Sequence, residues 1–212
     1  MREDPQQNRR ADVIYEDSRL LVCIKPRGVL ACKDASGKLS MNDLLAPREV
    51  YPVHRLDREV TGLMVFAKDP QCAAHLSKPE NLVKEYRALC QGRPEPNQGI
   101  MEDLLYHDRQ KNKTYVVKRK RAGVKPAKLS YSVLEYGEDR SLVHVHLYTG
   151  RTHQIRVQFA SRGYPLIGDR KYGGSSAEGI GLESYHLQLR HPDTGKQMDF
   201  SLNSNEQVQI EN

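Results

Sequence analysis

The sequence predicts an α+β protein built around a mostly antiparallel sheet of about eight or more strands with flanking helices. Short segments with the pattern of strands outnumber the segments with helical periodicity. Few pairs of these strands are separated by a connection long enough for parallel pairing, which requires a crossover of roughly a dozen residues or more. The chain has 212 residues, of which 38% are apolar, and this is enough to form a core in one domain.

The N-terminal part of the chain carries two strand signals and the start of a helix. Strands are predicted at 13–15 and 20–24. The second strand ends at Lys25-Pro26-Arg27-Gly28, since Pro and Gly interrupt strands. Residues 40–43 have the spacing of a capping box and therefore predict a short helix that ends near Pro47.

A polar loop and a buried strand follow. The loop covers residues 52–61. Residues 63–67 form a continuous apolar run, which is typical of a strand covered on both faces. Asp69 can cap a helix and Pro70 is favoured in a first helical turn, so a helix is predicted through Leu76.

Strand patterns dominate the rest of the chain. Further strands are predicted at 84–90, 114–117, 129–136, 142–148, 185–189 and 198–202. Side chains alternate along a strand with a period of two, so His144 and His146 should lie on the same face. A short helix is predicted at 153–161, where Ile155 and Phe159 form one apolar stripe.

We expect a single domain at residues 12–202, between flexible polar ends at 1–11 and 203–212. No apolar stretch approaches the ~20 residues that cross a bilayer, and the N-terminus has no apolar signal region. The cysteines show neither CxxC pairing nor a histidine at zinc-site spacing, which is typical of reduced thiols in a cytosolic protein. They are Cys23, Cys32, Cys72 and Cys90. We therefore expect a cytoplasmic monomer without membrane contact.

Positive charge is concentrated in one segment. The formal net charge of the chain is +6, but residues 106–128 carry nine Lys or Arg and one acidic residue, so this segment alone has a charge of +8. Such a local excess indicates a surface that faces a polyanion. The alternative is a lysine-rich strand edge that prevents aggregation.

Two segments are more polar than a core requires. His54-Arg55-Leu56-Asp57 places a carboxylate ahead of the apolar run, and Gly150-Arg151-Thr152-His153-Gln154-Ile155-Arg156 carries two arginines ahead of a helical pattern. Three further blocks are Lys25-Pro26-x-Gly28, Lys84-x-Tyr86-x-Ala88 and Pro165-x-Ile167-Gly168-Asp169-x-x-Tyr172-Gly173. In this order and spacing, the blocks resemble the RluA-type pseudouridine synthases over nearly the whole chain.

The chain departs from this family in two places. The family's loop motif, His-Arg-Leu-Asp-x-x-Thr-Ser-Gly, ends here as Val60-Thr61-Gly62. The C-terminal motif Leu-His-Ala appears as Leu182-Glu183-Ser184, which leaves the role of that motif open.

The resemblance implies the pseudouridine synthase catalytic fold, a bent mixed sheet with the active site in a central cleft. It implies an enzyme that flips a specific uridine out of structured RNA, either tRNA or rRNA, and isomerises it in place. The base is detached from ribose and rejoined through carbon 5 without redox change or loss of a group. We therefore expect neither an organic cofactor nor a metal.

The resemblance also assigns site residues. Asp57 would be the catalytic aspartate and Arg156 the counter-charge that keeps it ionised. Tyr86 would be the ring that stacks on the flipped uracil, and it could also take part in a proton transfer. Whether Asp57 attacks the sugar, attacks the base or abstracts a proton stays open. Ile167 or Leu182 would line the opposite wall of the pocket.

RNA contacts are expected from a larger set of side chains. Arg55 would enter the gap left in the base stack, or else contact a phosphate. The remaining contacts are expected from Arg151, His153, Gln154, Lys171, Lys118, Arg119, Lys120 and Arg121. With no room before the first strand, we expect no separate N-terminal RNA-binding domain, so the catalytic domain itself would recognise structured RNA.

Each assignment has a simpler alternative. Asp57 could cap a turn, Arg156 could lie on a helix surface and contact phosphate, and Tyr86 could be an ordinary core aromatic. A metal site at His144, His146 and His153 is not supported, because no Cys or carboxylate has a suitable spacing. At the level of function, the alternatives are an RNA-binding module without catalysis and a base-releasing glycosidase that uses Glu59 as a second carboxylate.

Overall fold

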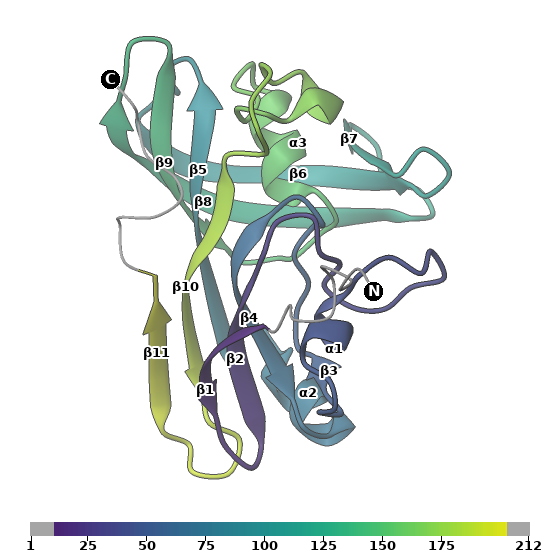
Figure 1. Cartoon of the computed structure of the whole chain (residues 1–212). Coiled ribbons are helices and arrows are strands. Elements are labelled where there is room, and N and C mark those ends of the chain that lie inside the picture. Colours follow the sequence, from purple (N-terminus) through teal and green to yellow (C-terminus); the bar gives the residue numbers. More distant parts are fainter. Residues whose placement is uncertain (1–10, 203–212) are drawn as a thin grey trace, which may run out of the picture.

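The computed structural model describes residues 11–202, so the flexible ends expected at 1–11 and 203–212 lie outside the described residues, apart from Ala11. Within this range, eleven strands form one sheet (Figure 1). The strands are β1 (Asp12–Glu16), β2 (Leu20–Lys25), β3 (Tyr51–Pro52), β4 (Thr61–Ala67), β5 (Leu82–Gln91), β6 (Gln98–Asp108), β7 (Lys113–Val117), β8 (Val124–Tyr136), β9 (Arg140–Leu147), β10 (Leu182–Arg190) and β11 (Gln197–Ser201). The helices are α1 (Met41–Leu44), α2 (Pro70–Leu76), α3 (Gln154–Ala160) and the 3-10 helix η1 (Arg170–Tyr172).

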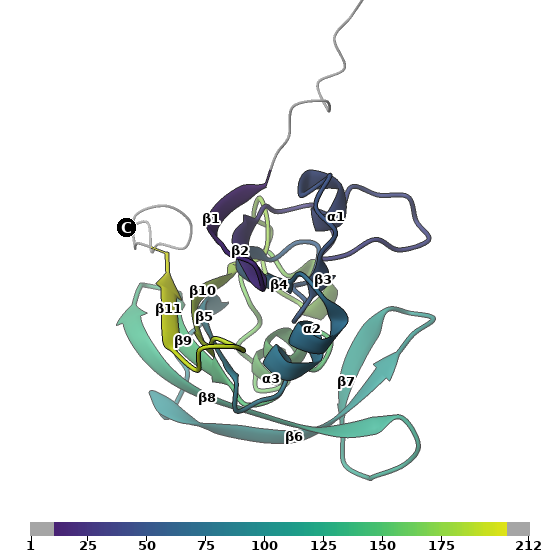
Figure 2. The same ribbon diagram turned by 90° about the horizontal axis from the view of Figure 1, so that it is seen from below.

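The sheet is mixed and mostly antiparallel, as predicted. Its strand order is β1-β2-β4-β10-β5-β9-β8-β6-β7, with β11 paired to β10 and β3 paired to β4. Among the described residues, only the pairing of β4 with β10 is parallel. In Figure 2, strands β6, β8 and β9 curve around α3, which therefore lies on the concave side of the bent sheet.

Most local predictions are confirmed. Ser40 and Asp43 form the predicted capping box of α1. Asp69 caps α2 by accepting a hydrogen bond from the Cys72 amide at 2.8 Å. All seven residues of β4 are buried.

Three elements were not predicted from the sequence, namely β3, β6 and η1. β6 contains acidic residues and two consecutive leucines, Leu104 and Leu105, which interrupt the apolar alternation. Its pairing with β8 on one side and β7 on the other stabilises it as a strand. Tertiary pairing therefore overrides the weak local pattern.

Two hydrophobic cores explain why β4 is apolar throughout. Met64 and Phe66 belong to the larger core, which includes Phe159 of α3. Leu63 and Val65 belong to the second core, which includes residues of α2 and β10. The two faces of β4 therefore pack against different elements, as a continuous apolar strand requires.

A glycine allows β4 and β10 to meet. Gly62 has a φ of +111°, and a Cβ atom at this position would lie 2.3 Å from the carbonyl oxygen of Ser184. Neither the conformation nor the distance is compatible with a side chain. The two motifs that depart from the family pattern, Val60-Thr61-Gly62 and Leu182-Glu183-Ser184, are therefore in contact here.

Candidate active site

Asp57 lies in the loop between β3 and β4. A lysine at the end of β2 is hydrogen-bonded to the backbone of this loop. The Lys25 side chain is fully buried, and its ammonium donates hydrogen bonds to the carbonyl oxygens of Pro26, Val29 and Arg58 at 2.9, 2.8 and 3.1 Å. The Gly28 amide donates to the same Arg58 carbonyl at 2.9 Å. Two sequence blocks that lie far apart along the chain therefore form one structural unit.

Burial destabilises the charged form of Lys25. Burial therefore lowers the pKa of Lys25 to about 8, and the negative charges of the nearby Asp57 and Glu59 only partly oppose this effect. Three carbonyl acceptors satisfy all the donors of the charged form.

The fork of Arg156 joins two carboxylates. Nη1 of Arg156 donates to Oδ2 of Asp57 at 2.7 Å. Nε and Nη2 donate to the two carboxylate oxygens of Asp169 at 2.6 and 2.8 Å. Such bidentate geometry fixes both the position and the plane of a guanidinium. The Arg156 side chain is 7% exposed and that of Asp169 is 1% exposed, whereas that of Asp57 is 26% exposed and remains open to a substrate.

Arg156 keeps its charge in this environment. Burial alone would lower the pKa of Arg156, but its hydrogen bonds to Asp169 and the charge of Asp57 outweigh burial and raise it. The guanidinium therefore places a permanent positive charge 2.7 Å from the Asp57 carboxylate.

His153 and Tyr172 complete the surroundings of Asp57. The Tyr172 hydroxyl accepts a hydrogen bond from the Thr114 amide at 2.8 Å and lies 2.8 Å from Nδ1 of His153. Nε2 of His153 lies 3.7 Å from Oδ2 of Asp57. Burial lowers the pKa of His153 to about 4, so the ring is neutral at neutral pH. A tautomer with the proton on Nε2 accepts from Tyr172 and directs its proton to Asp57.

Tyr86 lies in the centre of the sheet, close enough to Asp57 to be affected by its charge. It is 4% exposed and pairs with Ser184 of β10 and Val145 of β9. Burial raises the pKa of the Tyr86 hydroxyl, and the charge of Asp57 raises it further. The ring is therefore a neutral aromatic surface beside the carboxylate.

The three side chains predicted as catalytic therefore gather at one place, although they come from a loop, a strand and a helix. The two predicted wall residues lie in the same part of the molecule. Leu182 is buried in the core that includes Tyr86. Ile167 is half-buried, and its amide donates to the carbonyl oxygen of Leu89 in β5.

The residues expected to contact RNA divide into exposed and buried groups. Arg55 and Lys171 are exposed. Arg151 is half-buried, and its Nε donates to the carbonyl oxygen of Pro126. The residues of the loop between β7 and β8 are also exposed, and these are Lys118, Arg119, Lys120 and Arg121.

His153 and Gln154 are buried, which does not favour direct contact with RNA. His153 faces Asp57 as described above. The Gln154 side chain accepts from the Thr149 hydroxyl and the Arg151 amide and donates to the Lys128 carbonyl oxygen. We therefore reassign Gln154 to the support of the turn that precedes α3.

Sequence reasoning assigned no role to Asp169, Tyr172 or Lys25. All three belong to sequence blocks that resemble the family, so their positions in these blocks could have marked them as candidate site residues. Their roles depend on contacts with distant residues, and these contacts appear only in the folded chain. His144 and His146 contact Glu85, whereas His153 faces Asp57, so these three histidines do not converge.

Comparison with known proteins gives consistent results. The profile described as RNA pseudouridylate synthase matches residues 19–161. The chain is 32% identical over 215 residues to the protein named uncharacterized RNA pseudouridine synthase YlyB of Bacillus subtilis, and the match covers 89% of this chain and 67% of that protein. It is 31% identical over 222 residues to ribosomal large subunit pseudouridine synthase D of Yersinia pestis, covering 89% and 66%. The chain thus spans about two thirds of the length of these relatives.

Solved structures share the fold. Human RNA pseudouridylate synthase domain containing 4 superposes with a TM-score of 0.73 at 24% identity, covering 91% of this chain and 88% of that one. Human RNA pseudouridylate synthase domain containing 1 also has a TM-score of 0.73, at 21% identity, covering 94% and 86%. Among residues 11–202, no helix is long and apolar enough to span a membrane.

Proposed function

The chain belongs to the RNA pseudouridylate synthase family, and on this premise we propose that it isomerises a uridine in structured RNA to pseudouridine, with Asp57 as the catalytic aspartate. The observation that carries this proposal is the set of contacts around Asp57. A partly exposed carboxylate is paired at 2.7 Å with a buried arginine, and a second, fully buried carboxylate orients this arginine.

The reaction is an isomerisation within one nucleotide, and its chemical steps can take place beside a single ionised carboxylate. The bond between uracil N1 and ribose C1′ breaks, the base turns, and a bond forms between C5 and C1′. The proton on C5 leaves to solvent and N1 gains one, so atoms and charge balance without an oxidant. Asp57 would act as an ionised group beside C1′ or the base, and Arg156 would keep it ionised and hold it in place.

Tyr86 would hold the base during this rotation. Its ring is buried, neutral and next to Asp57, which suits stacking on a flipped uracil. Arg55 is exposed two residues before Asp57 and would fill the space that the base leaves in the RNA.

Two positively charged surfaces would bind the RNA backbone. One is the exposed loop at 118–121. The other is a groove of about 530 Å³ between β7, α3 and η1, and its lining includes Lys113, Arg170 and Lys171. Tyr172 lines the same groove and also contacts His153, so the groove adjoins the surroundings of Asp57. Backbone phosphates on either side of the flipped nucleotide would lie on these surfaces.

The names of the relatives support one class of RNA substrate over the other. Several of them are named ribosomal large subunit pseudouridine synthase D. We therefore propose ribosomal RNA ahead of transfer RNA.

The two alternative functions receive less support. A module that only binds RNA has no need of a carboxylate held by a buried arginine. A glycosidase would need a second carboxylate as an acid, but Glu59 is 43% exposed in its side chain and is paired with Arg58 at 2.8 Å.

The decisive test is mass analysis and pseudouridine mapping of RNA after incubation with the purified protein. Large-subunit rRNA and total tRNA from cells that lack the gene would be the substrates. Pseudouridine has the mass of uridine but a different site of attachment, so a new pseudouridine at a defined position supports the proposal. Loss of a base would indicate a glycosidase, and RNA that is bound but unchanged would indicate a binding module.

A further inference from the structure

The face of the sheet opposite Tyr86 carries a carboxylate surrounded by three histidines. On this face, Glu85 of β5 has Nδ1 of His186 at 2.9 Å, Nε2 of His144 at 3.4 Å and Nδ1 of His146 at 3.4 Å. The Tyr185 hydroxyl donates to the same carboxylate at 3.4 Å. We call these five residues the Glu85 cluster.

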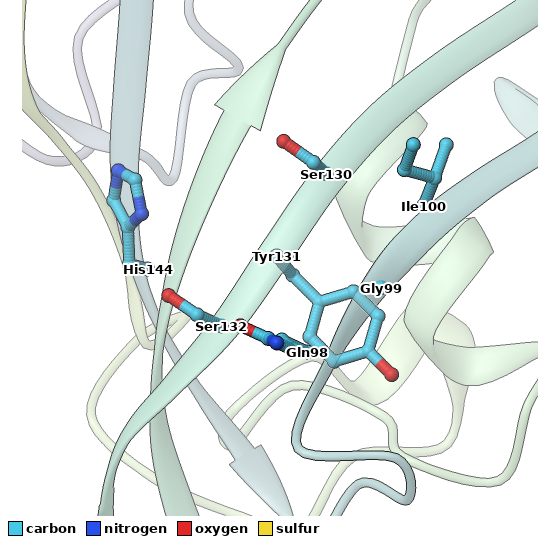
Figure 3. Close-up of a pocket in the computed structure, with 7 residues that line it drawn as sticks. All are labelled: Gln98, Gly99, Ile100, Ser130, Tyr131, Ser132 and His144. Carbon is cyan, nitrogen blue, oxygen red and sulfur yellow. The ribbon is translucent and has the colours of Figure 1, made fainter.

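The cluster is partly open to solvent. The Glu85 side chain is 22% exposed. Figure 3 shows His144 beside Ser132 at an open pocket of about 460 Å³, where β6, β8 and β9 lie next to one another. Among the described residues the cluster is therefore only partly covered, and the contacts between its own side chains contribute to its position.

Charge supports these contacts. Burial alone would raise the pKa of Glu85, but the contacts with His146, His144 and His186 outweigh burial and lower it. His186 also has Oδ1 of Asp199, in β11, at 2.9 Å from its second ring nitrogen. The His186 ring therefore lies between the carboxylates of Glu85 and Asp199 and links β5 and β10 to β11.

The cluster joins the strands that frame Tyr86. Glu85 pairs in register with His146 of β9 and with His186 of β10. The next residue, Tyr86, pairs with Val145 of β9 and Ser184 of β10. The contacts of Glu85 therefore connect the same three strands, one residue away from Tyr86 and on the other face.

This part of β10 needs such a connection because its register changes here. A bulge lies between Ser184 and His186, and its extra residue is Tyr185. A bulge disrupts the ladder and redirects side chains. Tyr185 is held on the outer face by the Glu85 carboxylate and by the guanidinium of Arg87, which lies 4.3 Å from its ring centroid.

We propose that Glu85, held by its three histidines, is a positioning residue that sets the place of Tyr86 relative to Asp57. This proposal rests on the proposed function, in which Tyr86 stacks on the flipped uracil. A displacement of about 1 Å at a reacting group can cost roughly 100-fold in rate. The Glu85 cluster, on the opposite face of β5, can therefore affect turnover without contacting RNA.

The test is the kinetics of Glu85→Gln, measured by tritium release from rRNA labelled at uracil C5. Glutamine keeps the shape of the side chain but removes the charge that three histidines share. We expect kcat to fall about 10-fold or more while KM for RNA changes less than about twofold, because the RNA-binding surfaces lie elsewhere. The matched control is Glu102→Gln, the same change on an exposed glutamate of β6 that is paired with Lys128. We expect it to leave both constants unchanged.

A second variant keeps the proposal testable if Glu85→Gln does not fold. His186→Gln keeps a hydrogen-bond donor next to Glu85 but removes the ring that bridges to Asp199, and it should lower kcat in the same selective way. Thermal unfolding of each variant separates loss of fold from loss of position. Equal kcat for Glu85→Gln and Glu102→Gln, or an equal change in kcat and KM, overturns the positioning role alone. A wild-type protein without turnover overturns the proposed function itself.

Discussion

At the scale of single residues, the candidate site depends on an uneven distribution of burial between two carboxylates. Asp57 and Asp169 share one guanidinium, but only Asp57 is open to a substrate. The buried carboxylate fixes the arginine, and the arginine in turn fixes the exposed carboxylate. A reactive group can therefore remain accessible without becoming mobile.

Asp57→Asn should abolish isomerisation and leave the fold and RNA affinity intact. The change removes the charge at nearly constant volume, and Asp169 continues to hold Arg156. We expect turnover below about 1% of wild type, since loss of an essential group commonly costs several orders of magnitude. Tritium release and a binding titration on the same RNA check this result, and residual turnover above that level would remove Asp57 from the catalytic role.

Arg156→Met should lower both turnover and stability. The change leaves Asp169 buried without a partner, and breaking a buried ion pair typically costs about 3–5 kcal/mol of the free energy of unfolding. Urea denaturation measures this loss. The double variant Arg156→Met, Asp169→Asn should recover part of the stability but none of the turnover, because only the buried unpaired charge is removed. Unchanged turnover with weaker RNA binding would instead identify Arg156 as a phosphate contact.

At the scale of elements, the end of β2 supports the loop that carries Asp57. The connection depends on one buried ammonium, that of Lys25, and on its three carbonyl acceptors. The neutral amine loses one of its three donors but no longer carries the cost of a buried charge, and the lowered pKa of Lys25 means that the second effect is larger.

The stability that Lys25 contributes should depend on pH in a defined direction. The folded pKa of about 8 lies below the ordinary value of 10.5, so the unfolded chain binds this proton more tightly. Between these two pH values the unfolded state holds more protons, and the free energy of unfolding therefore rises with pH; below about 8 the full cost of burying the charge applies. We expect a gain on the order of 2 kcal/mol from pH 8 to 10 relative to Lys25→Met, which lacks the titrating group. Urea denaturation of both proteins across this range gives the difference, and parallel curves would contradict the assignment.

At the scale of the whole molecule, the run of four consecutive cations at 118–121 lies apart from the candidate site. The loop with Lys118–Arg121 follows the edge strand β7, and Figure 1 shows this edge extending to one side, away from the turn between β10 and β11. Among the described residues, the ion pairs of Asp57 and Arg156 involve His153 and Asp169 and none of these four residues. RNA affinity and chemistry should therefore be separable.

Replacing Lys118, Arg119, Lys120 and Arg121 by Gln should weaken RNA binding and flatten the dependence of log affinity on log salt. The slope should change by roughly 0.7 for each lost phosphate contact with single-stranded RNA. Turnover at saturating RNA should change little. The control is the pair Arg190→Gln and Lys196→Gln near the turn between β10 and β11, which should keep the slope. A lysine-rich edge that only prevents aggregation predicts an unaltered slope and lower solubility.

The sequence by itself determined much of the fold and singled out three residues that the structure brings close together. Capping residues, Pro and Gly positions and apolar periodicity act over a few neighbours, so α1, α2, β4 and most other strands could be predicted. β6 could not, because its stability comes from pairing with β7 and β8. Asp57, Tyr86 and Arg156 could be named because they stand inside short blocks with a fixed order.

Only the tertiary structure decided which side chains meet. The pairing of Arg156 with Asp169, the support of the Asp57 loop by Lys25 and the burial of Gln154 all depend on contacts between distant segments. The same holds for Glu85, whose histidines come from two other strands. The local sequence pattern indicates whether a residue prefers a buried or an exposed environment. The packing of the whole chain decides which partner is paired with a buried charge.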